Sequence, residues 1–357
     1  MNTAAKNYDG VNKYIRITDI DEASSTYTDK DIVSPDGVLT DNYLVNNRDI
    51  LLARTGASTG KSYLYKKSDG KLYYAGFLIR ANVTTHDPYF VFSQLHTHRY
   101  WRWVSIMSAR SGQPGINSQE YSSFPIYTTS IEEESKIAKL LSLLDERIAT
   151  QNKIIEDLKK LKSAIIEIEY TPNTKTTSHI GNVIEQISKR NKNNAIQNVL
   201  SVSNRQGFIK QSDQFENRNV ASEDTSNYKI VEKNDFAFNP ARINVGSIAR
   251  LTTFEKGIVS PMYICFRTQE NVAPEYIDFF FESKHFYCEI QKRLEGSVRQ
   301  CLSFEGLCNI PFSLPSLEMQ QRIGKRLFIL GQKIKTETDL LELLNKQKYY
   351  LLRQMFI

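Results

Sequence analysis

The segment from Gly56 to Ser62 has the composition of a phosphate-binding loop. It reads Gly56-Ala57-Ser58-Thr59-Gly60-Lys61-Ser62 and follows a strand-like segment. A P-loop needs four residues between its glycines so that successive backbone N–H groups can wrap the phosphates. Here there are three. The spacing argues against nucleotide hydrolysis and favours a turn that presents small and basic side chains to a DNA phosphate or base edge.

A second segment, Asn239-Pro240-Ala241-Arg242, is similar to the Asn-Pro-Pro-aromatic motif of adenine methyltransferases. In that motif the aromatic residue stacks on a flipped base. This chain lacks the second proline and the aromatic residue, and no glycine-rich loop for a methyl donor accompanies the segment. We therefore expect no methyl transfer by this chain itself, and we assign no catalytic residue to it.

Acidic residues offer a weaker possibility, a nuclease site. Asp36 and Asp69, with Lys71, could hold a metal ion and orient water. Scattered acids of this kind are common, so solvated surface charges are the favoured interpretation. His96 and His98 lie two positions apart, which on a helix points them to different faces. We predict neither a metal site nor a cofactor.

The cysteines are Cys265, Cys288, Cys301 and Cys308, and they show no paired two-residue spacing. Neither a zinc knuckle nor a disulfide framework is indicated. We expect reduced core thiols in a cytoplasmic protein.

Composition excludes few classes of function. The chain has 357 residues, a net charge of +6 and 40% hydrophobic residues. No run of 18 apolar residues is present, and the polar start Met1-Asn2-Thr3 does not resemble a signal peptide. We expect no membrane association, whereas a mild positive charge is compatible with nucleic acid or an acidic partner.

Basic and amide side chains near the turns are the better candidates for chemistry. Arginine and lysine suit guanine, and asparagine and glutamine suit adenine, when a rigid turn holds them. Arg110 and Arg242 are the favoured base contacts. The full set is Arg54, Ser58, Thr59, Lys61, Arg110, Gln113 and Asn117, followed by Asn239, Arg242, Asn244, Arg293, Arg299 and Gln300. Trp101 and Trp103 could stack on bases, but core packing is favoured.

An internal repeat supplies the elements that would position these side chains. Residues 131–169 contain no Gly or Pro, and their apolar residues recur at intervals of four and three, as in a coiled coil. Adding 186 to each residue number reaches another apolar residue at all seven positions. Seven such matches would occur by chance with a probability of roughly two in a thousand. The predicted seam is Ile137, Leu141, Leu144, Ile148, Ile155, Leu158 and Ile165, and again Ile323, Leu327, Leu330, Ile334, Leu341, Leu344 and Leu351.

The same offset extends upstream of the predicted helices. Pro125 falls on Pro311, Pro88 on Pro274, Gly60 on Gly246, and Asp49 on Asp235. In each half we expect a strand, a glycine-containing turn, a helical stretch (88–102 and 274–294), a loop, and an extended segment before the long helix. The halves agree in the helices and differ at the turns, because the helix seams must satisfy the same packing twice.

These features predict an α+β protein with two mixed α/β domains alternating with two long helices. The expected order is domain 1–130, helix 131–170, linker 171–177, domain 178–316 and helix 317–357. Neither helix can bury its seam alone, so we expect an antiparallel coiled coil and a pseudo-twofold internal repeat. The alternative is that each helix folds back on its own domain.

The chain resembles the specificity subunits of type I restriction-modification systems over nearly its full length. The resemblance rests on the doubled arrangement and on two segments of the second half, Gly296-Ser297-Val298-Arg299-Gln300-Cys301-Leu302-Ser303 and the stretch from Ile310-Pro311-Phe312 to Gln320-Gln321-Arg322-Ile323. The first half repeats them as Ser111-Gly112-Gln113-Pro114-Gly115-Ile116-Asn117-Ser118, Phe124-Pro125-Ile126 and Glu132-Glu133-Glu134-Ser135-Lys136-Ile137.

The resemblance implies a non-catalytic subunit. Each domain would read one half of a split site on double-stranded DNA, and the helices would set the gap. The helices would also dock two adenine-N6 methyltransferase subunits, and the full complex would add ATP-dependent restriction subunits. Two alternatives stay open: a coiled-coil scaffold with protein-binding ends, and an autonomous nuclease or methylase.

One departure from the repeat concerns the opening of the second half. Residues 178–186 read Ser178-His179-Ile180-Gly181-Asn182-Val183-Ile184-Glu185-Gln186, and subtracting 186 gives no position in this chain. The first domain is therefore expected to lack the counterpart of this segment.

Overall fold

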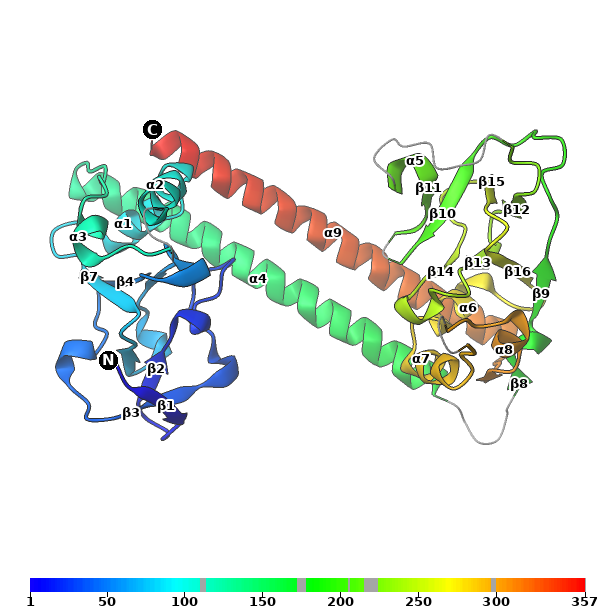
Figure 1. The fold of residues 1–357 in the computed structure, drawn as a ribbon, viewed down its shortest axis with the longest axis horizontal. Coiled ribbons are helices and arrows are strands. Elements are labelled where there is room, and N and C mark those ends of the chain that lie inside the picture. Colours follow the sequence, from blue (N-terminus) through cyan, green and yellow to red (C-terminus); the bar gives the residue numbers. More distant parts are fainter. Residues whose placement is uncertain (110–113, 172–177, 205, 215–223, 297–299, 357) are drawn as a thin grey trace. The chain divides into compact units, whose positions relative to one another are not determined.

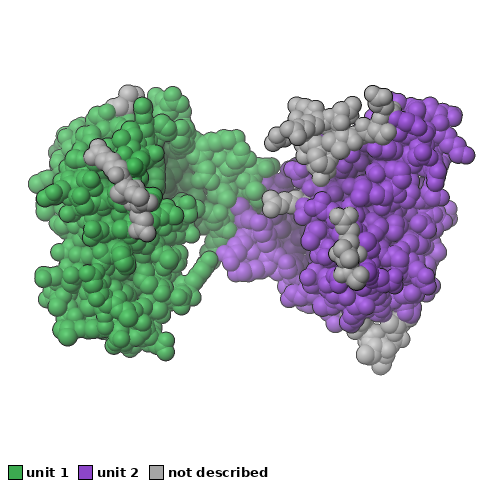
Figure 2. Space-filling view, in the orientation of Figure 1, with its two compact units in different colours: residues 1–154, 337–357 green, residues 155–336 purple. Residues whose placement is uncertain are grey.

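A computed structural model describes residues 1–109, 114–171, 178–204, 206–214, 224–296 and 300–356. The chain divides into two compact units (Figure 2), Met1–Ile154 with Glu337–Ile357, and Ile155–Thr336. Each unit holds one globular domain and a part of both long helices. No helix in the described part of the chain is long and apolar enough to span a membrane.

The two long helices are α4, Ile131–Tyr170, and α9, Leu317–Met355. Their first residues lie 186 apart, as the repeat predicts. In unit 1 they run antiparallel (Figure 1), because Asp145 is paired with Lys348 at 2.6 Å and Gln151 with Glu337 further along. In unit 2, Tyr170 of α4 shares a core with Ile323 and Leu327 of α9. All fourteen seam residues are buried or half-buried.

A buried polar pair interrupts the seam. Gln151 Nε2 donates to the backbone oxygen of Glu337 at 2.9 Å and to its carboxylate at 2.5 Å. The two residues are 186 positions apart, so repeat-equivalent residues face each other here. An antiparallel helix pair has a local twofold axis where equivalent positions meet, and a buried polar pair at such a point favours one register.

The globular domain of unit 1 is built around a three-stranded antiparallel sheet in the order β5-β4-β7. Its strands are β4 Asp49–Ala53, β5 Ser62–Leu64 and β7 Leu78–Asn82. Strands β2 Lys13–Ile15 and β6 Leu72–Tyr74 pair in parallel, and β1 Ala4–Asn7 pairs with β3 Val33–Asp36. The helices are α1 Pro88–Gln94, α2 His98–Ser108 and α3 Ser118–Ser122, with 3-10 turns at Ile17–Asp19, Asp29–Asp31, Asp41–Tyr43, Gly56–Ser58 and Lys67–Asp69.

The globular domain of unit 2 contains two four-stranded sheets, β14-β13-β16-β9 and β11-β10-β15-β12. The first comprises β9 Ile184–Ile187, β13 Phe236–Phe238, β14 Ile248–Arg250 and β16 Ile264–Thr268, and the second β10 Val199–Ser203, β11 Gly207–Lys210, β12 Lys229–Glu232 and β15 Lys256–Val259. Strand β8 Ser178–His179 pairs with β17 Pro311–Phe312. The helices are α5 Gln211–Gln214, α6 Pro274–Phe280, α7 Lys284–Gln291 and α8 Phe304–Cys308, with 3-10 turns at Ile180–Asn182 and Ile243–Val245.

The repeat extends to strand register. Lys13 of β2 lies opposite Leu72 of β6, and Val199 of β10 lies opposite Ile258 of β15; both pairings are parallel and 186 positions apart. Pro88 and Pro274 each occupy the first turn of a helix, where the missing N–H of proline costs nothing. The repeated α/β domains, the two long helices and their antiparallel pairing confirm the predicted fold class.

The expected helical stretches 88–102 and 274–294 are each two helices, not one. The break lies at Thr97 in unit 1 and at Ser283 in unit 2, and both hydroxyls accept an N-terminal backbone N–H of the second helix. These N-cap side chains offer the backbone a local partner and so favour a new helix start over continuation. The apolar pattern alone does not reveal this break.

The junction between domain and long helix is also repeated. Glu134 of α4 accepts the backbone N–H of Asp87, and Gln320 of α9 accepts that of Ala273, both at 2.9 Å. Both acceptors are almost fully buried, at 0% and 1% exposure. Each fixes the start of a long helix to the residue before the proline of α1 or α6.

Two expectations about core residues were wrong in part. Cys265 is buried, but Cys288 is exposed, so the cysteines are not all core thiols. Burial raises the pKa of Cys265 to about 12. Trp103 stacks on Tyr100, whereas Trp101, on the outer side of α2, is 43% exposed. The short helix α2 buries only one face, so neighbouring positions on it differ in exposure.

The opening segment of unit 2 forms β8 and β9. Within the described residues of unit 1, no strand pairs with β7 other than β4, and none pairs with residues 125–126.

Candidate nucleic-acid interface

In unit 1, the turn after β4 and the loop before α3 are joined by backbone hydrogen bonds. Ile116 N–H donates to the carbonyl of Arg54 at 2.9 Å, and Gly56 N–H donates to that of Pro114 at 3.0 Å. The two segments that carry the unit 1 candidates thus meet at one place. The glycine has a φ of +72°, in the left-handed region where a side chain is unfavourable.

Unit 2 repeats this joint. Leu302 N–H donates to the carbonyl of Pro240 at 3.0 Å. These residues lie 186 positions beyond Ile116 and Arg54, so the same bond occurs in both units. The following helix is capped in both: Asn117 accepts from Glu120 N–H, and Ser303 accepts from Gly306 N–H. The two candidate surfaces therefore share this backbone bond and this helix cap.

The backbone of the turn after β4 is not available to cradle a phosphate. The N–H groups of Thr59, Gly60 and Lys61 donate to the carbonyls of Gly56, Ala53 and Ser58, respectively. A P-loop depends on such groups pointing at the nucleotide. The observed bonds agree with the argument against nucleotide hydrolysis drawn from the spacing.

Two buried tyrosines hold this turn. Tyr121 donates from its hydroxyl to the carbonyl of Ala53 at 2.6 Å, and Tyr100 to that of Gly60 at 2.8 Å. Burial raises the pKa of Tyr121 to about 12. Both hydroxyls therefore tie the helices of this domain to the backbone of the turn.

The unit 1 candidates differ in availability. Arg54 is exposed and Ser58 is half-buried. Thr59 is buried, and its hydroxyl donates to the carbonyl of Gly56 at 2.8 Å. Lys61 is half-buried and pairs with Glu22 at 3.3 Å. Asn117 is exposed, but its oxygen caps α3.

The unit 2 candidates divide in the same way. Arg242 and Gln300 are exposed, and Asn244 is half-buried. Asn239 is buried, and its side-chain oxygen accepts from Ala241 N–H at 3.1 Å. Arg293 is half-buried and pairs with Glu289 at 2.5 Å. Three other candidates, Arg110, Gln113 and Arg299, lie outside the described residues.

Thr59 and Asn239 thus have structural partners. A hydroxyl or amide that bonds to its own turn fixes the backbone and has less capacity left for a base. Arg54 and Arg242 are the exposed guanidinium groups of the two turns, at repeat positions two residues apart. Guanidinium groups held on such turns suit phosphates and guanine edges.

The acidic residues considered for metal chemistry do not form a cluster of metal ligands in the described ranges. Asp69 accepts a hydrogen bond from the hydroxyl of Tyr63 at 2.5 Å, within its own domain. In the described ranges there is no group of three or more His, Cys, Asp or Glu side chains placed to hold a metal ion.

Sequence reasoning missed a basic hollow of about 830 Å³ in unit 2. Lys189, Arg190, Lys192 and Lys256 line it, together with the amide of Asn193. The signal was present in the run Lys189-Arg190-Asn191-Lys192-Asn193-Asn194. Clustered basic residues of this type suit a phosphate backbone.

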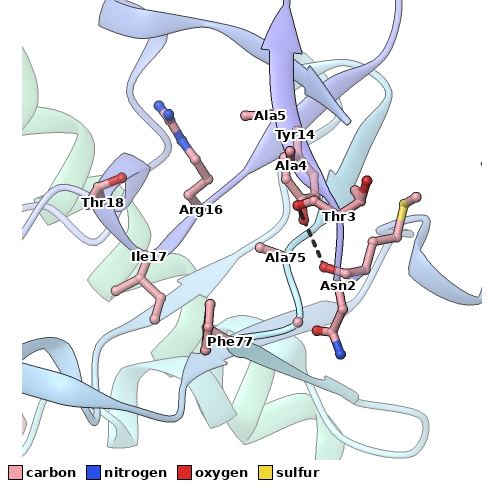
Figure 3. A pocket seen from close by; sticks show the side chains of 12 residues that line it. Asn2, Thr3, Ala4, Ala5, Tyr14, Arg16, Ile17, Thr18, Ala75 and Phe77 are labelled. Atoms are coloured by element: carbon pink, nitrogen blue, oxygen red, sulfur yellow. Dashed lines mark hydrogen bonds between the residues drawn. The ribbon is translucent and has the colours of Figure 1, made fainter. Parts of the chain in front are cut away.

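The equivalent segment of unit 1 lines an apolar hollow instead. Ala4 and Ala5, 186 positions before Arg190 and Asn191, lie in it with Ile17 and Phe77 (Figure 3). Its volume is about 590 Å³. Arg16 is the basic residue in its lining, and its guanidinium pairs with Asp19 at 2.8 Å. The equivalent segments 2–5 and 188–191 therefore line hollows of different chemistry, and the other lining residues of the two hollows are not repeat equivalents.

A protein-family model described as the type I restriction modification DNA specificity domain matches residues 1–160 and again 165–346. Among curated proteins, the chain is 24% identical over 336 residues to the "Type I restriction enzyme MjaVIII specificity subunit" of Methanocaldococcus jannaschii, covering 85% of this chain and 76% of that protein. It is 25% identical over 298 residues to the "Putative type I restriction enzyme MjaX specificity subunit" of the same organism, covering 76% of this chain and 66% of that protein.

Two solved structures share the fold. The S subunit of a type I restriction-modification system from M. genitalium has a TM-score of 0.63 at 15% identity, covering 99% of this chain and 94% of its own. A chain from a structure on complex assembly and conformational transition of the type I R-M system has a TM-score of 0.51 at 13% identity, covering 96% and 90%. Both likenesses span the domains and the helices.

Proposed function

The chain belongs to the type I restriction modification DNA specificity family, and on that premise we propose that each of its domains reads one half of a bipartite DNA site. The recognition domains are residues 1–130 and 178–316. Each presents the joint between the turn after its central strand and the loop before its short helix. The repeated backbone bond at Ile116 and Leu302 is the observation that carries this proposal.

The two joints are built alike and differ in their exposed side chains. Unit 1 has Arg54 where unit 2 has Pro240, and unit 2 has Arg242 where unit 1 has Gly56. A change in the position of a guanidinium on a rigid turn changes which base edge or phosphate it can reach. Two different half-sites call for this combination of a common scaffold and divergent side chains.

The long helices act as a spacer in this proposal. Helices of 40 and 39 residues pair through an apolar seam, and the buried Gln151–Glu337 pair favours one register. A fixed register fixes the length of the paired segment and hence the gap between half-sites. The alternative, a scaffold with protein-binding ends, has no comparable support in the family to which the chain belongs.

Methyltransferase subunits are the partners that we place on the helices, two per chain. Leu143 of α4 and Ile329 of α9 are repeat equivalents, and they are 47% and 57% exposed. In unit 1, Leu140 and Tyr350 are exposed as well. Large apolar side chains exposed on a charged helix mark a surface that a partner covers. The chain itself is non-catalytic in this proposal: methylation and ATP-dependent cleavage belong to the partner subunits.

A stoichiometry measurement tests the docking surface. We expect native mass spectrometry of the co-expressed complex to show two methyltransferase copies, and one copy with Leu143→Asp or with Ile329→Asp. Lys153→Asp, at an exposed position of the same helix, is the matched control and should retain two. Two copies in all variants would rule out this surface.

DNA binding tests the function itself. With co-purified methyltransferase, the chain should bind its target duplex, and affinity should fall steeply between 50 and 200 mM salt. Arg242→Ala should weaken binding to one half-site and Arg54→Ala to the other, each by about 1–3 kcal/mol if a base contact is lost. Absence of salt-dependent DNA binding would contradict the proposal, and equal losses at both half-sites would contradict one domain per half-site.

A further inference from the structure

An exposed aromatic side chain recurs at the same repeat position of both globular domains. Trp101 of α2 is 43% exposed, and Tyr287 of α7, 186 positions later, is 55% exposed. Among the described residues of the two domains, no other two large apolar side chains at this offset are both exposed. A single exposed ring needs no explanation, but its recurrence in two domains that otherwise diverge at their surfaces points to a shared role.

The backbone places the two rings alike. Trp101 N–H donates to the carbonyl of Thr97 at 3.2 Å. Tyr287 N–H donates to the carbonyl of Ser283 at the same distance. Thr97 and Ser283 are the N-caps of α2 and α7. Each ring therefore projects from the first turn of its helix.

Both helices pack beside the turns to which we assign DNA recognition. In unit 1, a methyl group added at Gly60 would lie 3.0 Å from a ring carbon of Trp101, so the ring borders the turn after β4. In unit 2, α7 packs against Ile243–Val245, which belongs to the turn after β13. The helix that carries the ring thus adjoins the turn that carries the exposed guanidinium of the same domain.

The surroundings of the unit 1 ring are basic. Trp101 lines a hollow of about 670 Å³ together with His98, Arg102, Ser105 and Ile106. The guanidinium of Arg102 belongs to an exposed residue. Within the described residues, the lining of this hollow contains no carboxylate. A polyanion can therefore approach the ring without meeting a like charge.

The unit 2 ring also has basic neighbours. Lys284 lies three residues before Tyr287 and Lys292 five residues after it, and both lysines are exposed. Lys292 pairs with Glu289 at 2.5 Å, and this carboxylate is buried. A flat ring flanked by cations suits nucleic acid, because the ring can pack on sugars and base edges while the cations meet phosphates.

We propose that Trp101 and Tyr287 pack against the DNA that their domains bind, each ring on a sugar or base edge beside the bases reached from the turn. This inference rests on the proposed function and adds to it a contact that positions the duplex without reading its sequence. The recurrence of the ring has a physical reason in this arrangement: two half-sites differ in their bases but share the same backbone.

Alkylation of Cys288 tests the position of the α7 face, because this thiol is exposed and directly follows Tyr287. The chain, co-purified with its methyltransferase, is treated with N-ethylmaleimide in the presence and absence of a mixed-sequence duplex of about 40 base pairs at about 50 mM salt. Peptide mass spectrometry follows the modification. We expect the duplex to slow alkylation of Cys288 at least tenfold. Arg102→Cys places a thiol at the repeat-equivalent position of unit 1, which should be protected in the same way.

Glu270→Cys is the matched control. Glu270 is exposed and follows β16. It lies at the end of the sheet away from the turn, because Phe238, which precedes the turn, is opposite Ile264 at the start of β16. The thiol at this position should react equally fast with and without the duplex.

Fluorescence anisotropy of the labelled duplex separates failure of this inference from failure of the proposed function. A bound duplex with unchanged alkylation of Cys288 would overturn the inference alone, whereas absence of binding would remove both. A Cys288 thiol already blocked without DNA would place the methyltransferase on this face and would also overturn the inference.

Substitution of the rings tests their contribution to affinity. Trp101→Ala and Tyr287→Ala should each weaken binding by about tenfold, for mixed-sequence and target duplexes alike. Trp101→Phe and Tyr287→Phe keep a ring and should retain most of the affinity. Because both side chains are exposed, the unfolding midpoints should not change. Undiminished binding by the alanine variants, or equal losses for alanine and phenylalanine, would contradict a ring contact with DNA.

Discussion

The turns after the central strands of units 1 and 2 share a backbone bond to the following loop but are supported by different side chains. In unit 1, the hydroxyls of Tyr100 and Tyr121 donate hydrogen bonds to backbone carbonyls of the turn. In unit 2, the equivalent positions are Phe286 and Leu307, which have no hydroxyl, and Asn239 bonds within the turn instead. A repeated fold can therefore keep this backbone bond while the side chains that support the turn change.

The long helices show the opposite behaviour. Their starting residues, seam positions and junction acceptors keep the 186-residue offset. Each helix packs against the other, so a change on one must suit its counterpart. A turn faces solvent and its own domain only, and it is free to diverge with the half-site that it reads.

The largest expected effect comes from lengthening both helices at their shared centre. Inserting one heptad after Gln151 and one before Glu337 preserves seam pairing, including the Gln151–Glu337 pair, and lengthens the paired segment by about 10 Å. At 3.4 Å per base pair, the gap between half-sites should grow by about three base pairs. Methylation of a library of targets with varied gaps measures this.

A heptad in α4 alone, within residues 145–160, is the control for that insertion. It mispairs the seam, and recognition of the spaced target should be altered or abolished. An unchanged gap preference with either insertion would refute the idea that the helices act as a ruler.

Truncating equivalent seam residues compares how strongly the long helices are packed in the two units. Leu327 is fully buried in the large core of unit 2, and its equivalent Leu141 is 1% exposed in a smaller cluster of unit 1. Leu→Ala at such sites costs about 2–5 kcal/mol. We expect Leu327→Ala to fall near the upper end and Leu141→Ala near the lower end, measured by denaturant unfolding. A larger cost for Leu141→Ala would reverse our comparison of the two cores.

Removing one hydroxyl tests how the unit 1 turn is held. Tyr121→Phe leaves the buried carbonyl of Ala53 without this partner and should cost about 1–3 kcal/mol. Exchange of the Gly60 amide, which also donates to this hydroxyl at 3.1 Å, should speed up. Tyr65→Phe, whose hydroxyl bond to Gly70 is exposed, serves as the control and should have little effect. Equal effects would show that the turn does not depend on Tyr121.

The smallest expected effect is a loss of stability at acidic pH. Burial lowers the pKa of His96 from 6.5 to about 4, and its ring nitrogens contact the carbonyl of Phe92 and the hydroxyl of Ser25. Below pH 6.5, His96 is protonated in the unfolded chain but stays neutral in the folded unit until about pH 4. The free energy of unfolding therefore decreases as the pH falls from about 6.5 to 4. Unit 2 has Glu282 at this position. Melting of His96→Gln should vary less with pH over this range; an unchanged pH dependence would exclude His96 as the cause.

The sequence predicted the fold where one constraint governs many residues. Heptad spacing located both helices, and the offset located Pro88 and Pro274 at helix starts. It did not predict the split at Thr97, because a single cap decides that break. The heptad pattern did not identify Gln151 and Glu337 as seam residues, because it was built from apolar residues only.

The sequence predicted which segments form the candidate site, but not how they are bonded or which of their side chains are available. Turn and loop were both identified, yet the bond between Ile116 and Arg54 depends on chain folding over about 60 residues. Thr59 and Asn239 have side chains suited to bases, and their burial against their own turns is visible only in three dimensions. The basic run at Lys189 was present in the sequence, but its position 50 residues before the second turn gave no reason to associate it with DNA.

Mapping methylated adenines tests the central claim most directly. The chain is expressed with its methyltransferase in a host without this modification, and every methylated adenine is located by single-molecule sequencing. We predict one split motif, two specified blocks separated by a fixed number of unspecified base pairs, with Arg242→Ala relaxing one block only. A continuous motif, or relaxation of both blocks by Arg242→Ala, would contradict two domains reading two half-sites.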